Sequence, residues 1–361
     1  MKDIDLKLKI IQNHIKHHDI KITDLAIEAG YARPYLSSVL NQSKKANHGI
    51  LDHLLQTLKI DYPLEKQRIL SLQNLIEDIE YALLYNDIES AKDLYLQLEK
   101  SASIPLLIRN EVSQKIKFYS AFFNKQLCPE KNDLHLAYNA FLSHNFNKAQ
   151  YHLNQLLAQQ QYNKTYQAVF YLYLSKAYIH LDQLHLAQAH YHQASQLLIE
   201  TRNYRRMVDA EIVAAKIYAL NRELEKALLI YDTLQMYNTI TTKQSDTIES
   251  DRLWSLIYNG IMPASKRIKE NTSAKLAVIY LTKDSDPCNN CEDFKNTIEK
   301  MFCKLMTDLR SHQLETEILF EATQLYKKEY FSNVFFKRIY KSLLLECLTE
   351  KRLYKDAYEL K

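Results

Sequence analysis

Glycine is scarce in this chain, and that scarcity limits the folds open to it. The 361 residues include three glycines, Gly30, Gly49 and Gly260, where average usage of about 7% would give roughly 25. Hairpin-rich sheets and phosphate-binding loops both need glycine, because their backbones take positive φ values or approach other groups closely. Neither the dinucleotide-binding pattern GxGxxG nor the P-loop pattern GxxxxGK[ST] occurs in the sequence. The sequence therefore predicts an all-α protein.

Charge and cysteine content limit the partners and the cellular compartment that the sequence predicts. The chain carries 47 Lys and Arg against 43 Asp and Glu, which argues against a general polyanion binder. Five cysteines, an odd number, fit a reducing compartment better than a disulfide framework. The first ten residues lack the apolar core of a signal peptide, and no run approaches the roughly 18 apolar residues that span a membrane. We expect a cytoplasmic protein.

The first sixty residues predict four short helices. Apolar spacing places them at 4–15, at 24–29, in a stretch that begins near residue 33, and at 48–60. Thr23 is expected to be the N-cap of the second helix, and Gly30 is expected to end it in the left-handed conformation. The residues expected to form the core of this pair of helices are Leu25, Ala26, Leu36, Val39 and Leu40. Ala26, Gly30 and Leu36 have the spacing of a helix-turn-helix.

This arrangement resembles the lambda-repressor-like (XRE-type) DNA-binding domains over about residues 4–62. The resemblance implies that the helix beginning near Arg33 enters the major groove and that Arg33 contacts guanine. It implies that Gln42 reads adenine and that Tyr35 packs on a thymine methyl group or binds phosphate. The full set of expected DNA contacts is Thr23, Arg33, Tyr35, Ser37, Ser38, Gln42, Lys44 and Lys45. The alternative is that any small helical bundle produces such a pattern.

Residues 63–361 predict a helical repeat. The segments 171–194 and 211–231 follow the tetratricopeptide pattern of small and aromatic positions, and 136–153 follows it more weakly. Stacked pairs of antiparallel helices would form a TPR-like right-handed α-solenoid with a concave groove. The polar stretch 239–251 indicates a break or a long connector inside the solenoid.

The C-terminal helices carry an apolar stripe with two interpretations. One is a repeat that caps the solenoid, and the other is a dimerisation surface. The stripe consists of Phe331, Phe335, Ile339, Leu343, Leu344 and Leu348.

The concave groove is the expected site for a peptide. Cations on the inner helices would bind a carboxylate, and asparagine amides would hold an extended backbone. The expected residues are Asn163, Tyr171, Lys176, Tyr178, Arg202, Asn203, Arg206, Asp209 and Lys216. The alternative for each charged residue is an ordinary solvated side chain.

Other sequence features carry little chemistry. Cys288 and Cys291 form a CxxC motif. We interpret it as a plain loop rather than as a metal site or a redox disulfide, because a zinc site would need a second pair of ligands that the sequence lacks. No nucleophile, base and orienting group stand in a recognisable pattern. We therefore expect no enzyme activity, no metal and no cofactor.

A DNA-binding domain at 1–62 followed by repeats at 63–361 resembles the RRNPP family of peptide-sensing transcriptional regulators. Segments 62–95 and 201–213 resemble the phage arbitrium receptors, in which Arg206 would match a peptide-contacting arginine. Tyr178 and Ile217 stand where that group has asparagines. The resemblance implies a homodimer that binds an operator in double-stranded DNA under the control of a short oligopeptide, in quorum sensing or lysis-lysogeny decisions.

Two other functions stay open at this point. One is a TPR protein-interaction scaffold that does not bind DNA. The other is a repeat protein that modulates an enzyme, against which the helix-turn-helix pattern argues.

Overall fold

The computed structural model is entirely helical in the part of the chain that it describes. That part comprises residues 3–101, 104–128, 132–159, 161–237, 240–262, 271–283, 296–328, 331 and 333–360. It forms 19 helices and no strand, which confirms the predicted all-α class. None of these helices is both long and apolar enough to cross a bilayer. The chain divides into two compact units, Met1–Leu142 and Ser143–Lys361.

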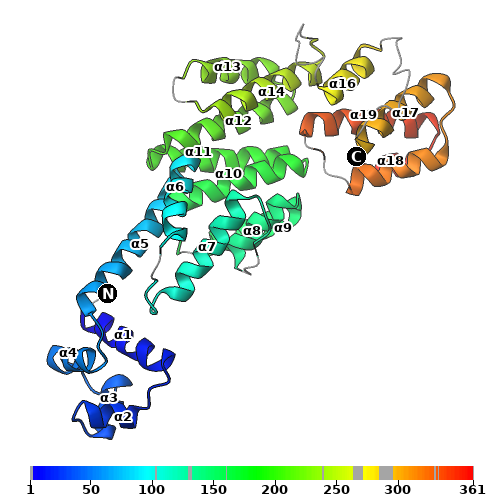
Figure 1. Cartoon of the computed structure of the whole chain (residues 1–361). Coiled ribbons are helices and arrows are strands. Elements are labelled where there is room, and N and C mark those ends of the chain that lie inside the picture. The colour runs from blue at the N-terminus through cyan, green and yellow to red at the C-terminus, as the bar shows by residue number, and fades with distance from the viewer. Residues whose placement is uncertain are drawn as a thin grey trace. The chain divides into compact units, whose positions relative to one another are not determined.

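The first unit consists of α1 to α8 (Figure 1). Their bounds are α1 Asp3–His17, α2 Ile22–Glu28, α3 Arg33–Leu40, α4 His48–Thr57, α5 Tyr62–Leu84, α6 Ile88–Glu99, α7 Arg109–Phe123 and α8 Asp133–Leu142. One hydrophobic core runs through this unit from Leu6 on α1 to Tyr119 on α7. The predicted domain boundary at residue 62 lies inside this unit, and it stays a prediction.

The turn between α2 and α3 follows the expectation for a left-handed glycine. Gly30 has φ +70°, a value that costs glycine little and other residues more. Leu25, Leu36 and Val39 are buried beneath the turn, as predicted. The prediction of Thr23 as N-cap was wrong: α2 begins at Ile22, its N-cap is Lys21, and no side chain caps it. Thr23 thus lies within the first turn of the helix.

A cluster of charged and polar side chains joins α1 to α4 and α5. Lys66 and Tyr62 on α5 both donate to Oδ1 of Asp3, each at 2.6 Å. Lys7 is nearly buried, lies 3.6 Å from Asp3, and donates to Asp52 on α4 at 2.6 Å. The hydrogen bonds from Lys66 and Tyr62 lower the pKa of Asp3 from 3.8 to about 2, because they favour the carboxylate. The cluster therefore ties α1 and α4 to α5 through ionised groups.

Asp3→Asn should lower the thermal stability of the first unit at neutral pH. A carboxyl group with a depressed folded-state pKa stabilises the fold above its unfolded-state pKa, and the contribution is lost as pH falls through the folded-state value. For Asp3 the loss runs from 3.8 down to about 2. The difference in unfolding temperature between wild type and variant, followed by circular dichroism, should therefore shrink over that range. A difference that is the same at pH 7 and pH 2 would contradict this account.

The second unit consists of α9 to α20. The bounds are α9 Phe146–Ala158, α10 Lys164–His180, α11 Leu184–Glu200, α12 Tyr204–Leu220, α13 Leu224–Gln235, α14 Thr242–Tyr258, α16 Thr272–Thr282, α17 Thr297–Ser311, α18 Thr316–Lys328, α19 Val334–Glu350 and α20 Tyr354–Leu360. Helices α10 to α14 follow one another as antiparallel neighbours (Figure 1). In addition α10 contacts α12, and α12 contacts α14. These three helices, α10, α12 and α14, form what we call the inner row.

Two sequence-based interpretations of this unit were wrong. The stretch 239–251, predicted as a break, contains the first part of α14, which begins at a capping box formed by Thr241 and Gln244. Few apolar residues mark this helix because its buried side includes Gln244, Asp251 and Ser255. The C-terminal apolar stripe is not a free dimerisation surface, since all six of its side chains are buried within this chain. Cys288 and Cys291 lie outside the described residues.

Candidate functional site

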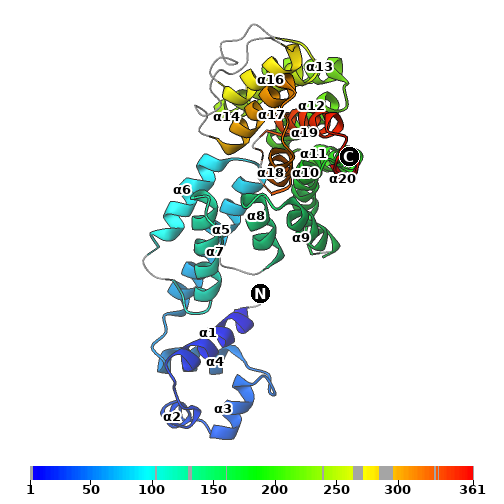
Figure 2. The same ribbon diagram turned by 90° about the vertical axis from the view of Figure 1, so that its right-hand side faces the viewer.

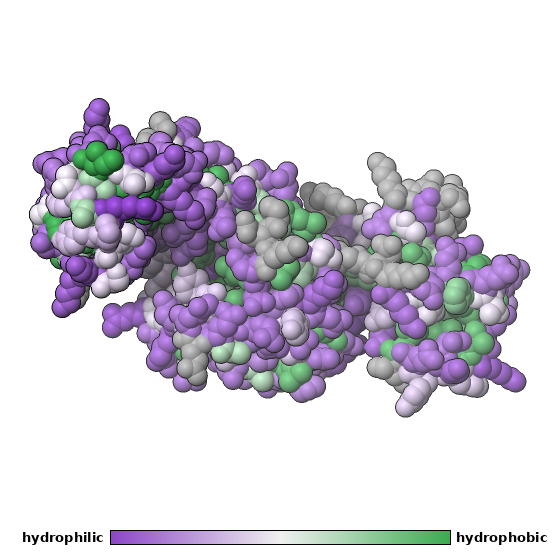
Figure 3. Space-filling model, turned by 90° about the horizontal axis from the view of Figure 1, so that it is seen from below, coloured by the Kyte–Doolittle hydropathy of each residue, from purple (hydrophilic) through white to green (hydrophobic). Residues whose placement is uncertain are grey.

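The eight residues expected to contact DNA all lie on α2, on α3 or in the turn that follows α3. Thr23, Arg33, Gln42, Lys44 and Lys45 are exposed, and the other three are half-buried. Arg33 is the first residue of α3, so its guanidinium stands at the positive end of the helix dipole. Most of the surface in Figure 3 is hydrophilic, with hydrophobic side chains in small separate areas.

Aromatic contacts fix the position of α3. The ring of Tyr35 lies 5.9 Å from that of Tyr31, which meets His53 on α4 edge-on at 5.7 Å. The ammonium group of Lys44 lies 5.2 Å from the centre of the Tyr35 ring, a cation–π contact. His53 also forms a hydrogen bond from its Nε2 atom to the carbonyl oxygen of Ala29, just before the turn, at 3.2 Å. Tyr35 and Lys44 thus form one surface element, and α4 holds the turn.

The remaining polar residues of α3 are partly used within the helix. Ser38 donates to the carbonyl of Pro34 at 2.7 Å, and Ser37 accepts from the amide of Asn41 at 3.4 Å. Gln42 lies beyond the end of α3 with φ +61°. Arg33, Gln42, Lys44 and Lys45 therefore remain as the exposed long side chains on this surface.

The inner row of the second unit holds a chain of charged and polar contacts. Arg206 on α12 is buried and donates to Oδ2 of Asp209 at 3.3 Å. Oδ1 of the same aspartate accepts from Gln244 on α14 at 2.9 Å. On α10, the ammonium group of Lys176 lies 5.0 Å from the centre of the Tyr173 ring. Burial raises the pKa of the Tyr173 hydroxyl, but the nearby cations of Arg206 and Lys176 outweigh that effect and leave the pKa below its usual value.

Four of the residues predicted to bind a peptide lie on helices of the inner row: Lys176, Arg206, Asp209 and Lys216. Lys216 on α12 forms an ion pair with Asp251 on α14 at 2.9 Å. The Asp251 side chain is 8% exposed and that of Lys216 is 25% exposed. Arg206 and Lys216 thus already have carboxylate partners, and a ligand carboxylate that bound either cation would compete with Asp209 or Asp251.

Lys216→Gln should destabilise the second unit by roughly 1–3 kcal/mol, because it leaves the buried carboxylate of Asp251 without its cation. Lys226→Gln is the matched control, since its pair with Glu223 is exposed and such pairs contribute little. Urea unfolding followed by the fluorescence of Trp254 measures both. The double variant Lys216→Gln/Asp251→Asn should regain part of the lost stability. Equal losses in Lys216→Gln and Lys226→Gln would contradict a stabilising ion pair between Lys216 and Asp251.

Four of the other five predicted groove residues have structural contacts. Asn163 is the N-cap of α10 and accepts from two backbone amides, and Asn203 is the buried N-cap of α12 and accepts from the amide of Arg206 at 3.2 Å. Tyr171 and Tyr178 on α10 both stack on His190 of α11, at 5.7 and 5.2 Å, so they lie between α10 and α11. Arg202 is exposed in the turn before α12, with φ +53°.

Three residues that take part in the polar contacts of the inner row were not predicted from the sequence: Tyr173, Gln244 and Asp251. Tyr173 lies three residues before Lys176, a spacing that places both on one face of a helix. The other two lie in or at the end of the stretch that was interpreted as a connector. A search for capping boxes would have found α14, because Thr241 and Gln244 have the required spacing.

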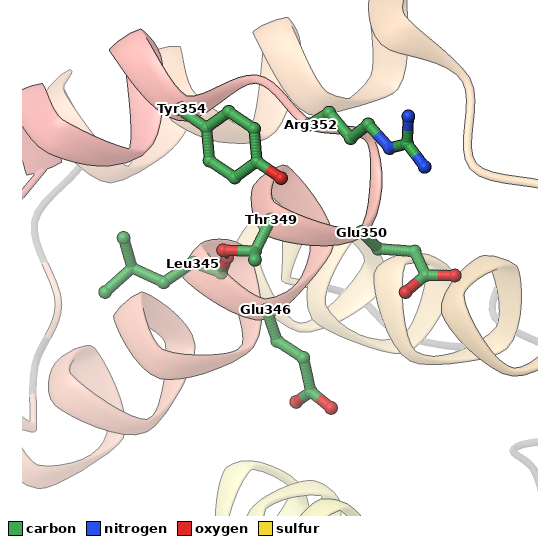
Figure 4. A pocket seen from close by; sticks show the side chains of 6 residues that line it. All are labelled: Leu345, Glu346, Thr349, Glu350, Arg352 and Tyr354. Carbon is green, nitrogen blue, oxygen red and sulfur yellow. Dashed lines mark hydrogen bonds between the residues drawn. The ribbon is translucent and has the colours of Figure 1, made fainter.

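A shallow depression of about 610 Å³ lies at the turn between α19 and α20 (Figure 4). Its lining residues are Leu345, Glu346, Thr349, Glu350, Arg352 and Tyr354. None of the residues predicted from the sequence lines it. Among the residues that the structure describes, no group of three or more His, Cys, Asp or Glu side chains is placed to hold a metal ion.

The chain was compared with protein-family models, with curated proteins and with solved structures, and none of the three comparisons found a match.

Proposed function

We propose that this protein is a sequence-specific DNA-binding transcriptional regulator that a short oligopeptide controls. In this proposal α2 and α3 are a helix-turn-helix, and the helices of the second unit are TPR-like repeats whose inner row receives the peptide. In this proposal the regulator is cytoplasmic and acts as a homodimer. Two copies double the number of phosphate contacts that one weakly basic domain provides.

One observation carries the DNA-binding part: α3 combines a buried apolar side with exposed long polar side chains at its two ends. Leu36 and Val39 are fully buried against the bundle, while Arg33 at its start and Lys44 after its end are exposed. A recognition helix needs this division, since the buried side fixes its orientation and the other side contacts bases and phosphates.

The inner row supports the peptide-binding part. Its helices place Tyr173, Lys176, Arg206 and Asp209 close together, with cations, a carboxylate and an aromatic ring for a peptide's termini and side chains. A peptide changes DNA affinity only if it binds one arrangement of these helices better than another. Competition with Asp209 for Arg206 would be one such difference.

The first test is binding of the full chain to genomic duplex fragments at two salt concentrations. We expect selective binding that weakens as salt rises, because phosphate contacts release counterions. Failure to bind any fragment, with the protein folded, would contradict the DNA-binding part and favour the interaction scaffold.

The second test adds peptides encoded by short reading frames near the gene to the same assay. We expect one of them to change the affinity for DNA, and Asp209→Asn to alter its effect. Normal DNA binding with no response to any peptide would contradict the peptide-sensing part alone.

A further inference from the structure

Arg338 on α19 contacts the ends of all three helices of the inner row. Its guanidinium donates to the Leu220 carbonyl at the end of α12 at 3.1 Å and to the Tyr258 hydroxyl at the end of α14 at 3.5 Å. The same group donates to Asp182 in the turn after α10, more than 150 residues away in sequence. In stacked repeats each pair of helices normally contacts only its neighbours. A contact that spans three of them is therefore unusual.

Two further cations of α19 reinforce this contact. Lys337 donates to the carbonyl of His180, the last residue of α10, at 3.3 Å, and Lys341 lies 3.4 Å from Asp182. Cations at the C-terminal end of a helix are favourable because the carbonyl groups there carry partial negative charge. The Lys337, Arg338 and Lys341 side chains together thus bind the negative ends of α10 and α12.

The contacts of α19 with α14 and α17 include aromatic ring contacts, unlike the polar contacts just described. Phe336 lies 5.9 Å from Trp254 on α14 and 5.1 Å from Phe302 on α17, and Phe335 lies 5.7 Å from Tyr258 on α14. Helix α19 also packs on α16 and α18. Its attachment to α14 therefore includes apolar ring contacts, whereas the contacts described above with the ends of α10 and α12 are hydrogen bonds and ion pairs.

From this division we infer that α19 is a charge-dependent staple that sets the curvature of the inner row, with Arg338 and Asp182 as its two essential residues. Because α19 is fixed to α14 by apolar packing, breaking the polar contacts frees α10 and α12 to change their angle to α14. The inference concerns the second unit alone and does not depend on the proposed regulatory function.

The exposure of the residues fits a staple that can open. The Arg338 side chain is 17% exposed and that of Asp182 is 41% exposed, so water reaches the pair from one side. The Nε atom of Arg338 is buried and has no hydrogen-bond partner among the described residues. A buried donor without a partner costs free energy, which leaves the closed arrangement less favourable than full pairing would make it.

The test measures a distance across the staple by pulsed electron paramagnetic resonance on the full chain, without DNA or peptide. Nitroxide labels are attached through unnatural amino acids at the exposed positions His185 on α11 and Glu317 on α18, so the native cysteines stay in place. We expect a narrow distribution in the wild type. Arg338→Gln and Asp182→Asn should both lengthen the mean distance and broaden the distribution, and Arg338→Lys should give an intermediate result.

Asp182→Asn keeps the test valid if Arg338→Gln unfolds. Asp182 lies in a turn with φ +64°, where asparagine is well tolerated. Lys351→Gln, an exposed residue at the end of α19, is the control that should leave the distribution unchanged. Wild-type distributions in both Arg338→Gln and Asp182→Asn would overturn the inference and show that helix packing alone sets the curvature.

Discussion

Replacing Arg33 with alanine is expected to reduce the affinity for a specific operator roughly 5- to 150-fold. A bidentate arginine–guanine contact contributes about 1–3 kcal/mol of discrimination, and about 1.4 kcal/mol corresponds to a factor of ten. Arg33 is exposed and is the first residue of α3. In the proposed function α3 is the recognition helix, and the N-terminal residues of such a helix contact base edges. Titration of a selected duplex and of a scrambled duplex, with wild type and variant, measures the loss.

The matched control is Arg109→Ala, which removes an exposed arginine from α7 in the same unit. It changes the net charge equally, so a purely electrostatic loss would appear in both variants. Lys45→Ala should weaken binding to the selected and scrambled duplexes alike, because phosphate contacts carry no sequence information. If Arg33→Ala and Arg109→Ala had equal effects on the specific duplex, the recognition role of α3 would be refuted.

Local sequence signals predicted the first four helices well. Apolar spacing and Gly30 located the turn between α2 and α3, because a left-handed residue and a row of buried leucines are encoded within a few positions. Thr23 was misassigned because Ile22 also packs against the core and moves the helix start ahead of it. The boundary at residue 62 depends on the relation of α1 and α4 to α5, which involves Asp3 and residues sixty positions away.

The candidate site of the second unit was harder to predict, because it depends on contacts between distant helices. Asn163 and Asn203 have the right chemistry for a peptide backbone, but local backbone amides already engage their side chains. Helical periodicity places Arg206 and Asp209 on one face, but it does not show that Gln244 of α14 donates to Asp209. Arg338 gave no signal at all, since the partners of its guanidinium lie eighty or more residues away in sequence.

Phe302→Ala should lower the free energy of unfolding of the second unit by about 3–5 kcal/mol, the range for a large aromatic side chain removed from a core. The side chain is fully buried, and its ring lies within 6 Å of those of Phe336, Tyr340 and Tyr280. Alanine would leave a cavity beneath α19, which closes only in part because neighbouring helices are fixed by their other contacts.

The chain supplies its own control, since Phe320 on α18 is 68% exposed. Phe320→Ala removes the same atoms from a surface position, where substitutions usually change stability by less than about 0.5 kcal/mol. Trp254 is the one tryptophan of the chain and lies next to Phe336, so its fluorescence during urea unfolding reports on this unit. A large difference between the two variants follows if α17 and α19 share one core. Equal midpoints would show that these C-terminal helices do not pack around Phe302.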